Sequence, residues 1–218
     1  MKIFLFALLT ALVFTSCTLE QHINFNDDYS GRYEFTMDFS AMKGFMDAAA
    51  EEEGEAPQSL TEDMNVDSVV QALNSAPGLS NAVVSEENGK LVIGYDFANV
   101  ETLNMVMQEM DMTSMLSSAS GGKANMDADG AGKSSIERNG KKISFEMADL
   151  KDAGDADELQ GMGSMMNFNV QMTFPDEIKK VKNKNAIVSG DGKTVTVSAN
   201  FEELLSGAVS PSMTVKLK

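Results

Sequence analysis

The chain has 218 residues and is strongly acidic, with 33 Asp and Glu against 17 Lys and Arg and a formal net charge of −16. It contains one cysteine, no tryptophan and 17 methionines. The acidity argues against a nucleic-acid binder, because neutralising phosphates needs clustered basic residues. A single cysteine excludes an intrachain disulfide and a cysteine-rich zinc site. We therefore expect no nucleic-acid partner and no cofactor.

The first 16 residues predict a cleaved signal peptide. Lys2 precedes an apolar run from Ile3 to Phe14, which is followed by Thr15-Ser16-Cys17. A positive start, an apolar run and small residues before a cleavage point are typical of secretory signals. The run is too short to cross a bilayer, which takes about 20 apolar residues. We expect cleavage between Ser16 and Cys17.

The motif Thr15-Ser16-Cys17 resembles the lipobox of bacterial lipoproteins, and the short leader rich in Phe and Leu looks like those of the Bacteroidota. In that family the cysteine thiol is lipidated and the leader is cut just before it. The resemblance implies an envelope protein held by acyl chains at the outer membrane, on its periplasmic face or at the cell surface. An ordinary secretory signal with an incidental cysteine is the alternative. Residues 17–28 are then expected to be the lipidated Cys17 and a polar tether.

Three copies of one turn motif predict three β-hairpins. The copies are Asn88-Gly89-Lys90, Asn139-Gly140-Lys141 and Asp191-Gly192-Lys193, each between strand-like runs. Asn-Gly and Asp-Gly accept the positive φ angles that a two-residue hairpin turn requires. The predicted strand pairs are 82–85 with 91–97, 134–137 with 142–147, and 186–189 with 194–199.

An internal repeat is the second folding feature. Apolar and polar residues alternate over 32–39 and again over 167–174, which predicts strands with one buried face. Each of these strands is followed by a connection, one of the hairpins and a helix. The repeats span about 32–110 and 167–206. A further alternating strand is predicted at the C-terminus around Val215.

Residues 29–218 are expected to form a single α+β domain. Apolar spacing and capping residues predict helices at 42–49, 66–73, from about 100, and at 201–205. Loops poor in apolar residues are predicted at 51–63, 117–133 and 151–164. The expected architecture is an antiparallel sheet, built from the hairpins and single strands, with helices packed on one face.

Part of the second repeat resembles a family of envelope lipoproteins. Met-Thr-Phe-Pro-Asp-Glu at 172–177 is followed by Asn185-Ala186 and by Asp-Gly-Lys-Thr-Val-Thr-Val at 191–197. This order is similar to the domain of LppM-like bacterial lipoproteins, in which an apolar strand ends in Phe-Pro before an Asn-containing turn and a closing hairpin. The resemblance implies an α+β envelope lipoprotein that contacts lipids or glycolipids, and it carries over no binding residue.

A methionine cluster is the main candidate site. Its members are Met105, Met107, Met110, Met112 and Met115. Thioethers are soft ligands that suit Cu(I), and methionine also lines adaptable apolar grooves. Ordinary core packing is the third interpretation, because Met107 and Met110 share a helical face with Leu103 and Val106. The exposure of Met105, Met112 and Met115 distinguishes these interpretations.

A weaker candidate is a calcium loop. Asn125, Asp127 and Asp129 place oxygen ligands at alternate positions before Gly130. The twelfth position of such a loop is a bidentate Glu, but this chain has Ile136 there. A chance match in an acidic, Gly-rich segment is the competing interpretation.

No catalytic constellation is recognisable. The sole histidine, His22, lies on the expected tether, where no Ser-His-Asp arrangement can be held. We therefore expect a binding or structural role, with an apolar groove between helices and sheet for a lipid or a protein partner. The rival is a carboxylate-based hydrolase of the envelope, which needs a deep pocket with two acids of raised pKa.

Overall fold

The computed structural model describes residues 17–41, 43, 66–109, 134–147 and 166–218. The expected leader, the helix at 42–49 apart from Lys43, and the three expected loops lie outside these residues. The described elements, in chain order, are β1 (Cys17–Phe25), β2 (Gly31–Asp38), α3 (Val66–Ser75), β3 (Leu79–Glu87), β4 (Lys90–Phe97), α4 (Val100–Glu109), β5 (Ser135–Asn139), β6 (Lys142–Glu146), β7 (Met166–Thr173), β8 (Ile178–Lys182), β9 (Ile187–Val188), β10 (Thr194–Asn200), α7 (Phe201–Leu205) and β11 (Met213–Leu217).

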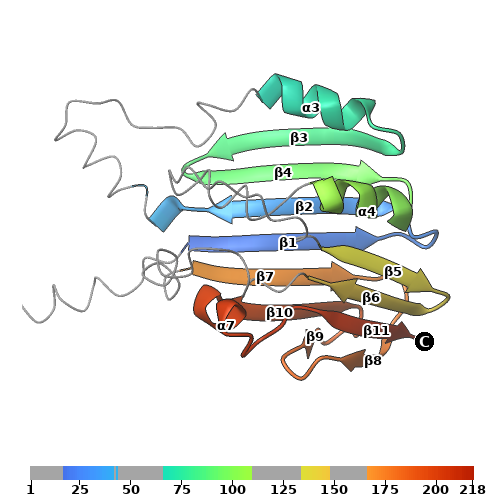
Figure 1. Ribbon diagram of the computed structural model, residues 1–218. Coiled ribbons are helices and arrows are strands. Elements are labelled where there is room, and N and C mark those ends of the chain that lie inside the picture. Colours follow the sequence, from blue (N-terminus) through green and yellow to red (C-terminus); the bar gives the residue numbers. More distant parts are fainter. Residues whose placement is uncertain (1–16, 42, 44–65, 110–133, 148–165) are drawn as a thin grey trace, which may run out of the picture.

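The strands form two sheets (Figure 1). The first has the order β3-β4-β2-β1-β7-β10-β9, and the second has the order β5-β6-β11-β8. All neighbours in the first sheet are antiparallel except β1 and β7, which are parallel. Outward from β1 the sheet continues as β2, β4 and β3 on one side and as β7, β10 and β9 on the other. The first strands of the two expected repeats, β2 and β7, lie on opposite sides of β1, with β2 antiparallel and β7 parallel to it.

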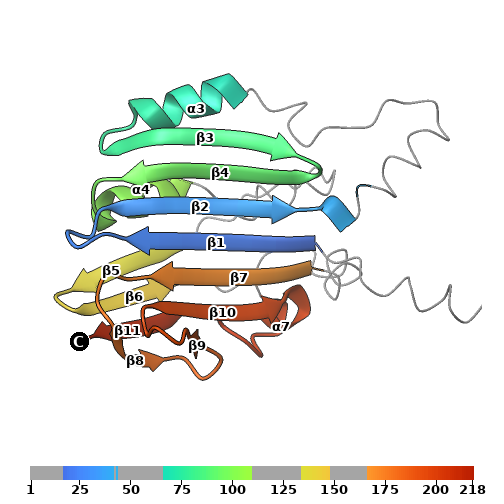
Figure 2. The ribbon, with the colours of Figure 1, turned by 180° about the vertical axis from the view of Figure 1, so that it is seen from behind.

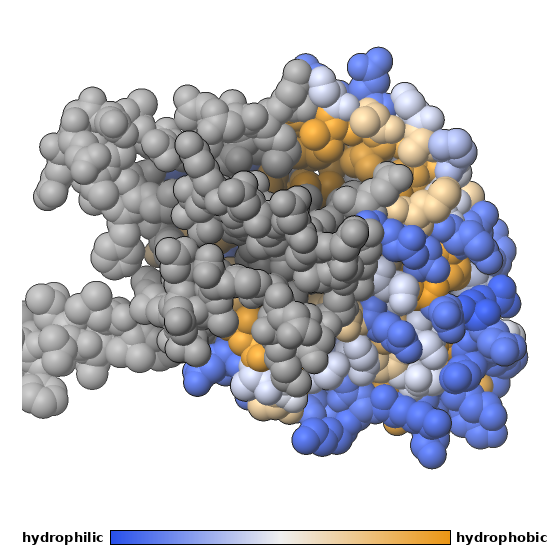
Figure 3. Space-filling view, in the orientation of Figure 1, coloured by the Kyte–Doolittle hydropathy of each residue, from blue (hydrophilic) through white to orange (hydrophobic). Residues whose placement is uncertain are grey.

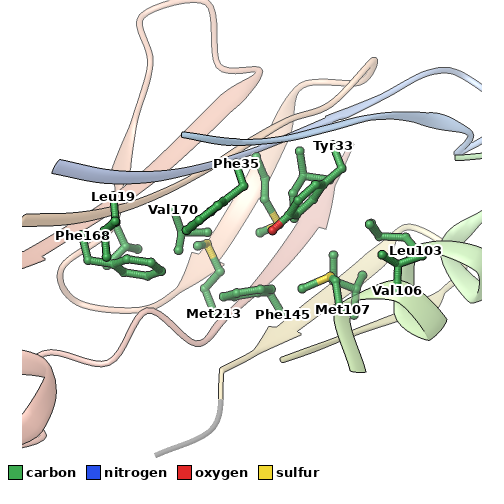
Figure 4. Close-up of a cluster of buried hydrophobic side chains, with 14 of the residues drawn as sticks. Leu19, Tyr33, Phe35, Leu103, Val106, Met107, Phe145, Phe168, Val170 and Met213 are labelled. Atoms are coloured by element: carbon green, nitrogen blue, oxygen red, sulfur yellow. The ribbon is translucent and has the colours of Figure 1, made fainter. Parts of the chain in front are cut away.

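The core lies between the two sheets. Side chains alternate between the faces of a strand, so the central strands of the first sheet each point one set of side chains inward. Figure 4 shows Leu19, Phe35 and Val170 from the first sheet facing Phe145 and Met213 from the second, all buried. Helix α4 contributes to the same layer. The opposite face of the first sheet is not covered by any described element (Figure 2).

Local turn and cap residues explain several element boundaries. β3 and β4 pair antiparallel, and the turn between them holds Asn88 at φ 54° and Gly89 at φ 78°. Helix α7 begins with a capping box: the Asn200 side chain accepts from the Glu203 backbone N–H at 2.8 Å, and the Glu203 carboxylate accepts from the Asn200 N–H at 2.9 Å. The sequence expectation for this helix start is confirmed.

Two expectations about the architecture are wrong. The strands do not form a single antiparallel sheet, because β5, β6, β8 and β11 make a second sheet and β1 pairs parallel with β7. Residues 17–25 are not a tether, because they form the central strand β1. Its alternation is hidden in the sequence by Gln21, a polar side chain that points into the core and is 2% exposed.

Gln21 belongs to a buried polar cluster with Tyr33 and Tyr95. Its Nε2 donates to the Tyr33 hydroxyl at 3.0 Å, and the two tyrosine rings stack with centroids 5.0 Å apart. The Gln21 Oε1 and the Tyr95 hydroxyl are buried without a hydrogen-bond partner in the described part of the chain. Burial raises the pKa of Tyr33 to about 12 and raises the pKa of Tyr95 as well. The neutral hydroxyl forms are therefore favoured by the fold.

The raised pKa of Tyr33 predicts that the folded domain loses stability at alkaline pH. An unfolded tyrosine ionises near pH 10, whereas Tyr33 in the fold ionises near pH 12. Its contribution to stability is therefore complete below pH 10 and is lost as the pH rises towards 12. We expect circular dichroism and tyrosinate absorbance to change together in this range, and the change to be smaller in Tyr33→Phe. Ionisation of all three tyrosines near pH 10 with the fold intact would contradict this prediction.

Two methionines of α4 provide a matched pair for the core. Met107 is 4% exposed and Met105 is 51% exposed. We expect Met107→Ala to lower the free energy of unfolding by about 2–5 kcal/mol, because it leaves a cavity. Met105→Ala should change it by less than about 0.5 kcal/mol. Urea denaturation of both variants measures the difference, and equal effects would rule out the assigned helix face.

Candidate functional site

Cys17, the expected lipidation site, is the first residue of β1. It pairs with Met166 of β7, and the next residue, Thr18, pairs with Asp38 of β2. Its side chain is 1% exposed, and burial together with the charge of Asp38 raises the pKa of the thiol. A thiol with a raised pKa is a poor nucleophile. No residue separates Cys17 from the sheet, so any group on it is attached directly at this end of the domain.

A cleft of about 550 Å³, which we name the Arg32 cleft, lies at the end of the first sheet opposite Cys17. It is formed where the β1–β2 turn, the end of β4 and the chain entering β3 meet. The polar side chains of Asn24, Asn26, Ser30, Arg32 and Asp96 contribute to its walls. The sheet register explains this grouping, because Asn24, Arg32 and Asp96 are paired across three adjacent strands.

The charges in this cleft are held in a network. Arg32 Nη1 lies 3.0 Å from Asp96 Oδ1, and the Asn81 amide donates to Asp96 Oδ2 at 2.7 Å. Gly94 leaves room for the guanidinium, because a Cβ at this position would lie 2.8 Å from Arg32 Nη2. Arg32 and Asp96 thus present a fixed donor and a fixed acceptor beside neutral amides and a hydroxyl. Such a set can bind hydroxyl, amide or carboxylate groups of a ligand.

The described carboxyl groups do not form the pair that the hydrolase alternative requires. The Arg32 cleft contains a single carboxylate, that of Asp96. Where a pKa shift is resolved for a carboxyl group within the described ranges, the pKa is lowered. The strongest causes are hydrogen bonds from Ser30 to Asp28, from Ser40 to Asp38, from Lys218 to Glu177 and from Ser189 to Asp191. These acids stabilise turns and strand ends rather than hold a proton for transfer.

The sole histidine lies on the uncovered face of the first sheet and not on a tether. His22 Nε2 is 3.6 Å from the Glu20 carboxylate on the same strand. Among the residues that the structure describes, no group of three His, Cys, Asp or Glu is placed to hold a metal ion. His22 therefore lies beside one carboxylate, with no recognisable catalytic or metal-binding set around it in this part of the chain.

The methionine cluster is only partly visible. Met107 is buried in the core and Met105 is exposed, so the structure does not bring these two side chains to one surface. Met110, Met112 and Met115, and the calcium candidates Asn125, Asp127 and Asp129, lie outside the described residues. Copper and calcium binding stay predictions. Within the described residues, side chains such as Phe145 and Met213 are buried between the sheets.

Sequence reasoning did not find the Arg32–Asp96 cleft. Arg32 was assigned to the polar face of a strand, and Asp96 lies between two buried aromatic residues of another strand. Their pairing depends on the register between β2 and β4, which local patterns do not specify.

None of the helices that the structure describes has the length and apolarity needed to cross a membrane.

Comparison with known proteins gives little further information. No protein-family model matches the chain, and no curated protein matches it in sequence. Among solved structures, it is similar to the folded domain of the LppM protein of Mycobacterium tuberculosis, with a TM-score of 0.46 and 12% identity over 95% of this chain and 93% of that one. The Fcho1 mu homology domain of Danio rerio gives a TM-score of 0.20 and 7% identity over 93% and 79%. Both TM-scores are below 0.5, so neither similarity assigns a function to this chain.

Proposed function

We propose that this chain is a lipid-anchored protein of the bacterial cell envelope with a binding role, attached through acyl chains on Cys17. The observation that carries the proposal is the place of Cys17, which follows the expected leader and begins the central strand. Its lipobox resemblance to lipoproteins of the Bacteroidota supports acylation at this residue. Two or more acyl chains give stable attachment, because each buried CH₂ contributes about 0.8 kcal/mol.

The anchor would determine how the domain faces the membrane. Because β1 begins at Cys17, no flexible linker separates the acyl chains from the sheet. The end of the first sheet with Cys17 and Asp38 would lie at the lipid headgroups. Nine residues of β1 span roughly 26 Å, so the Arg32 cleft at the other end would face away from the membrane.

The proposed binding role rests on the polar Arg32 cleft rather than on the expected apolar groove between helices and sheet. Arg32 and Asp96 are fixed in place and lie beside Asn24, Asn26 and Ser30, which suits a ligand rich in hydroxyl or amide groups. An apolar groove is supported less, because Met107 and Phe145 are buried in the described core. We assign no catalytic activity to the chain. The proposal includes a location at the outer membrane.

The anchor is tested by metabolic labelling with palmitate. We expect the full chain to incorporate the label in a bacterial host and Cys17→Ser to incorporate none. Thr18→Ser, one residue further along β1, is the matched control and should be labelled normally. If Cys17→Ser still incorporates the label, or if the unchanged chain incorporates none, the proposed anchor at Cys17 is wrong.

The orientation is tested with two exposed acidic positions at opposite ends of the first sheet. Glu87 lies at the Cys17 end, and Asp27 lies in the β1–β2 turn. In the acylated protein, Glu87→Cys or Asp27→Cys supplies a free thiol for a fluorophore. In vesicles that contain a headgroup quencher, we expect stronger quenching at position 87 than at position 27. Equal quenching would show that the domain is not held upright by β1.

A further inference from the structure

Basic residues gather in one part of this acidic chain. Residues 178–218 contain seven lysines and three acids, although the whole chain has a formal charge of −16. Three lysines on adjacent strands of the second sheet are in register: Lys142 of β6 pairs with Lys216 of β11, and Lys216 pairs with Lys180 of β8. We name these three residues the lysine row. All three side chains are exposed.

The lysine row lies on the outer face of the second sheet. Its neighbours along β11, Val215 and Leu217, are buried, so Lys216 points to the other side. Lys182 lies further along β8, opposite Thr214 on the same face. Figure 3 shows hydrophilic side chains over the part of the molecule where this sheet lies.

Nearby acids do not neutralise the lysine row. Asp176 and Glu177 are the carboxylates of the preceding loop, and they pair with Lys141 and Lys218 instead. No carboxylate of the described residues lies within ion-pair distance of the lysine row. Acids do adjoin the Lys142 end of the row, because Glu101 and Glu137 line one hollow with Lys142 and Glu146 lies at the other end of β6. The positive charge is therefore least compensated at Lys216, Lys180 and Lys182, away from these acids.

Structural roles explain only part of this arrangement. β8 is an edge strand, and lysine on an edge strand discourages pairing with other chains. That reason accounts for Lys180 and Lys182. It does not account for Lys142 and Lys216, which belong to interior strands. Like charges directly opposite each other destabilise a sheet, so the row lowers the stability of the fold without an evident structural return.

We propose that the lysine row and Lys182 bind an anionic polysaccharide, a chain with a regularly repeated carboxylate or phosphate group. The three positions lie in a line across strands spaced about 4.8 Å apart, so the row is about 10 Å long and suits a linear polyanion. Lysine acts as a point charge and accepts either anion. Protein interfaces have an apolar core in which lysine is depleted, and the chain neighbours Ile143, Val215 and Leu217 are buried while Val181 is half-buried.

The direction of the surface also favours a polymer over the anchoring membrane. β8 follows β7 at the end of the first sheet opposite Cys17, so the lysine row lies towards that end (Figure 1). This step rests on the proposed anchor at Cys17. With that anchor, the row would face the space beyond the membrane. Negative charges elsewhere on the domain act weakly here, because charges more than about 8–10 Å away are screened at physiological salt.

The test uses the full chain with Cys17→Ser, so that the result does not depend on acylation. Binding to polygalacturonate is measured by titration calorimetry, with neutral dextran as the comparison. We expect salt-sensitive binding to polygalacturonate alone. The double variant Lys180→Gln/Lys216→Gln should bind roughly tenfold more weakly, since each exposed charge pair contributes up to about 1 kcal/mol. Lys180→Arg/Lys216→Arg keeps the charges and should retain binding.

The matched control removes two lysines at the other end of the first sheet. Lys43→Gln/Lys90→Gln changes the net charge by the same amount and should leave the affinity unchanged. Thermal unfolding should show that the Lys180/Lys216 variant is folded and no less stable, because the like-charge row is relieved. If both double variants lose affinity for polygalacturonate equally, the binding depends only on net charge and the proposal is overturned. Binding to phosphatidylcholine–phosphatidylglycerol vesicles or to a DNA oligonucleotide in place of polygalacturonate would also overturn it.

Discussion

The hydrogen bonding of β1 to both β2 and β7 holds the two halves of this domain together. On one side β1 meets the strand that leads to β4 and β3, and on the other it meets the strand that leads to β10 and β9. Its inward side chains, among them Leu19 and Ile23, are almost fully buried between the two sheets. Without β1, β2 and β7 each lose one of their two neighbouring strands, and the second sheet loses the central part of the surface on which it packs.

The sequence predicts those parts of the fold that depend on neighbouring residues. Turn residues such as Asn88-Gly89 and the capping residues of α7 act over a few positions, and strand alternation at 32–39 and 167–174 is visible directly. The assembly of the second sheet could not be predicted, because β8, the β5–β6 pair and β11 come from segments far apart in the chain. β1 was missed for a local reason: Gln21 interrupts its apolar face, and its hydrogen bond to Tyr33 is visible only in three dimensions.

The candidate site was less predictable than the fold. Arg32 and Asp96 belong to strands separated by 64 positions, and their contact follows from the register of β2 on β4. The lysine row has the same origin, because Lys142, Lys180 and Lys216 are unremarkable in a list of residues and become neighbours only through strand pairing. Composition gives the net charge of the chain but not its distribution. A strongly acidic chain can therefore present a surface of the opposite sign.

The parallel pairing of β1 with β7 has a consequence for the order in which the chain is synthesised and folds. Glu20 and Asn169, which are opposite one another, are 149 positions apart, so β1 leaves the ribosome long before its partner. Contacts between distant positions form slowly, since a long loop must close first. In the folded domain the Cys17 side chain is buried. For the anchor proposed at Cys17, we therefore expect the acyl groups to be added before β1 pairs with β7.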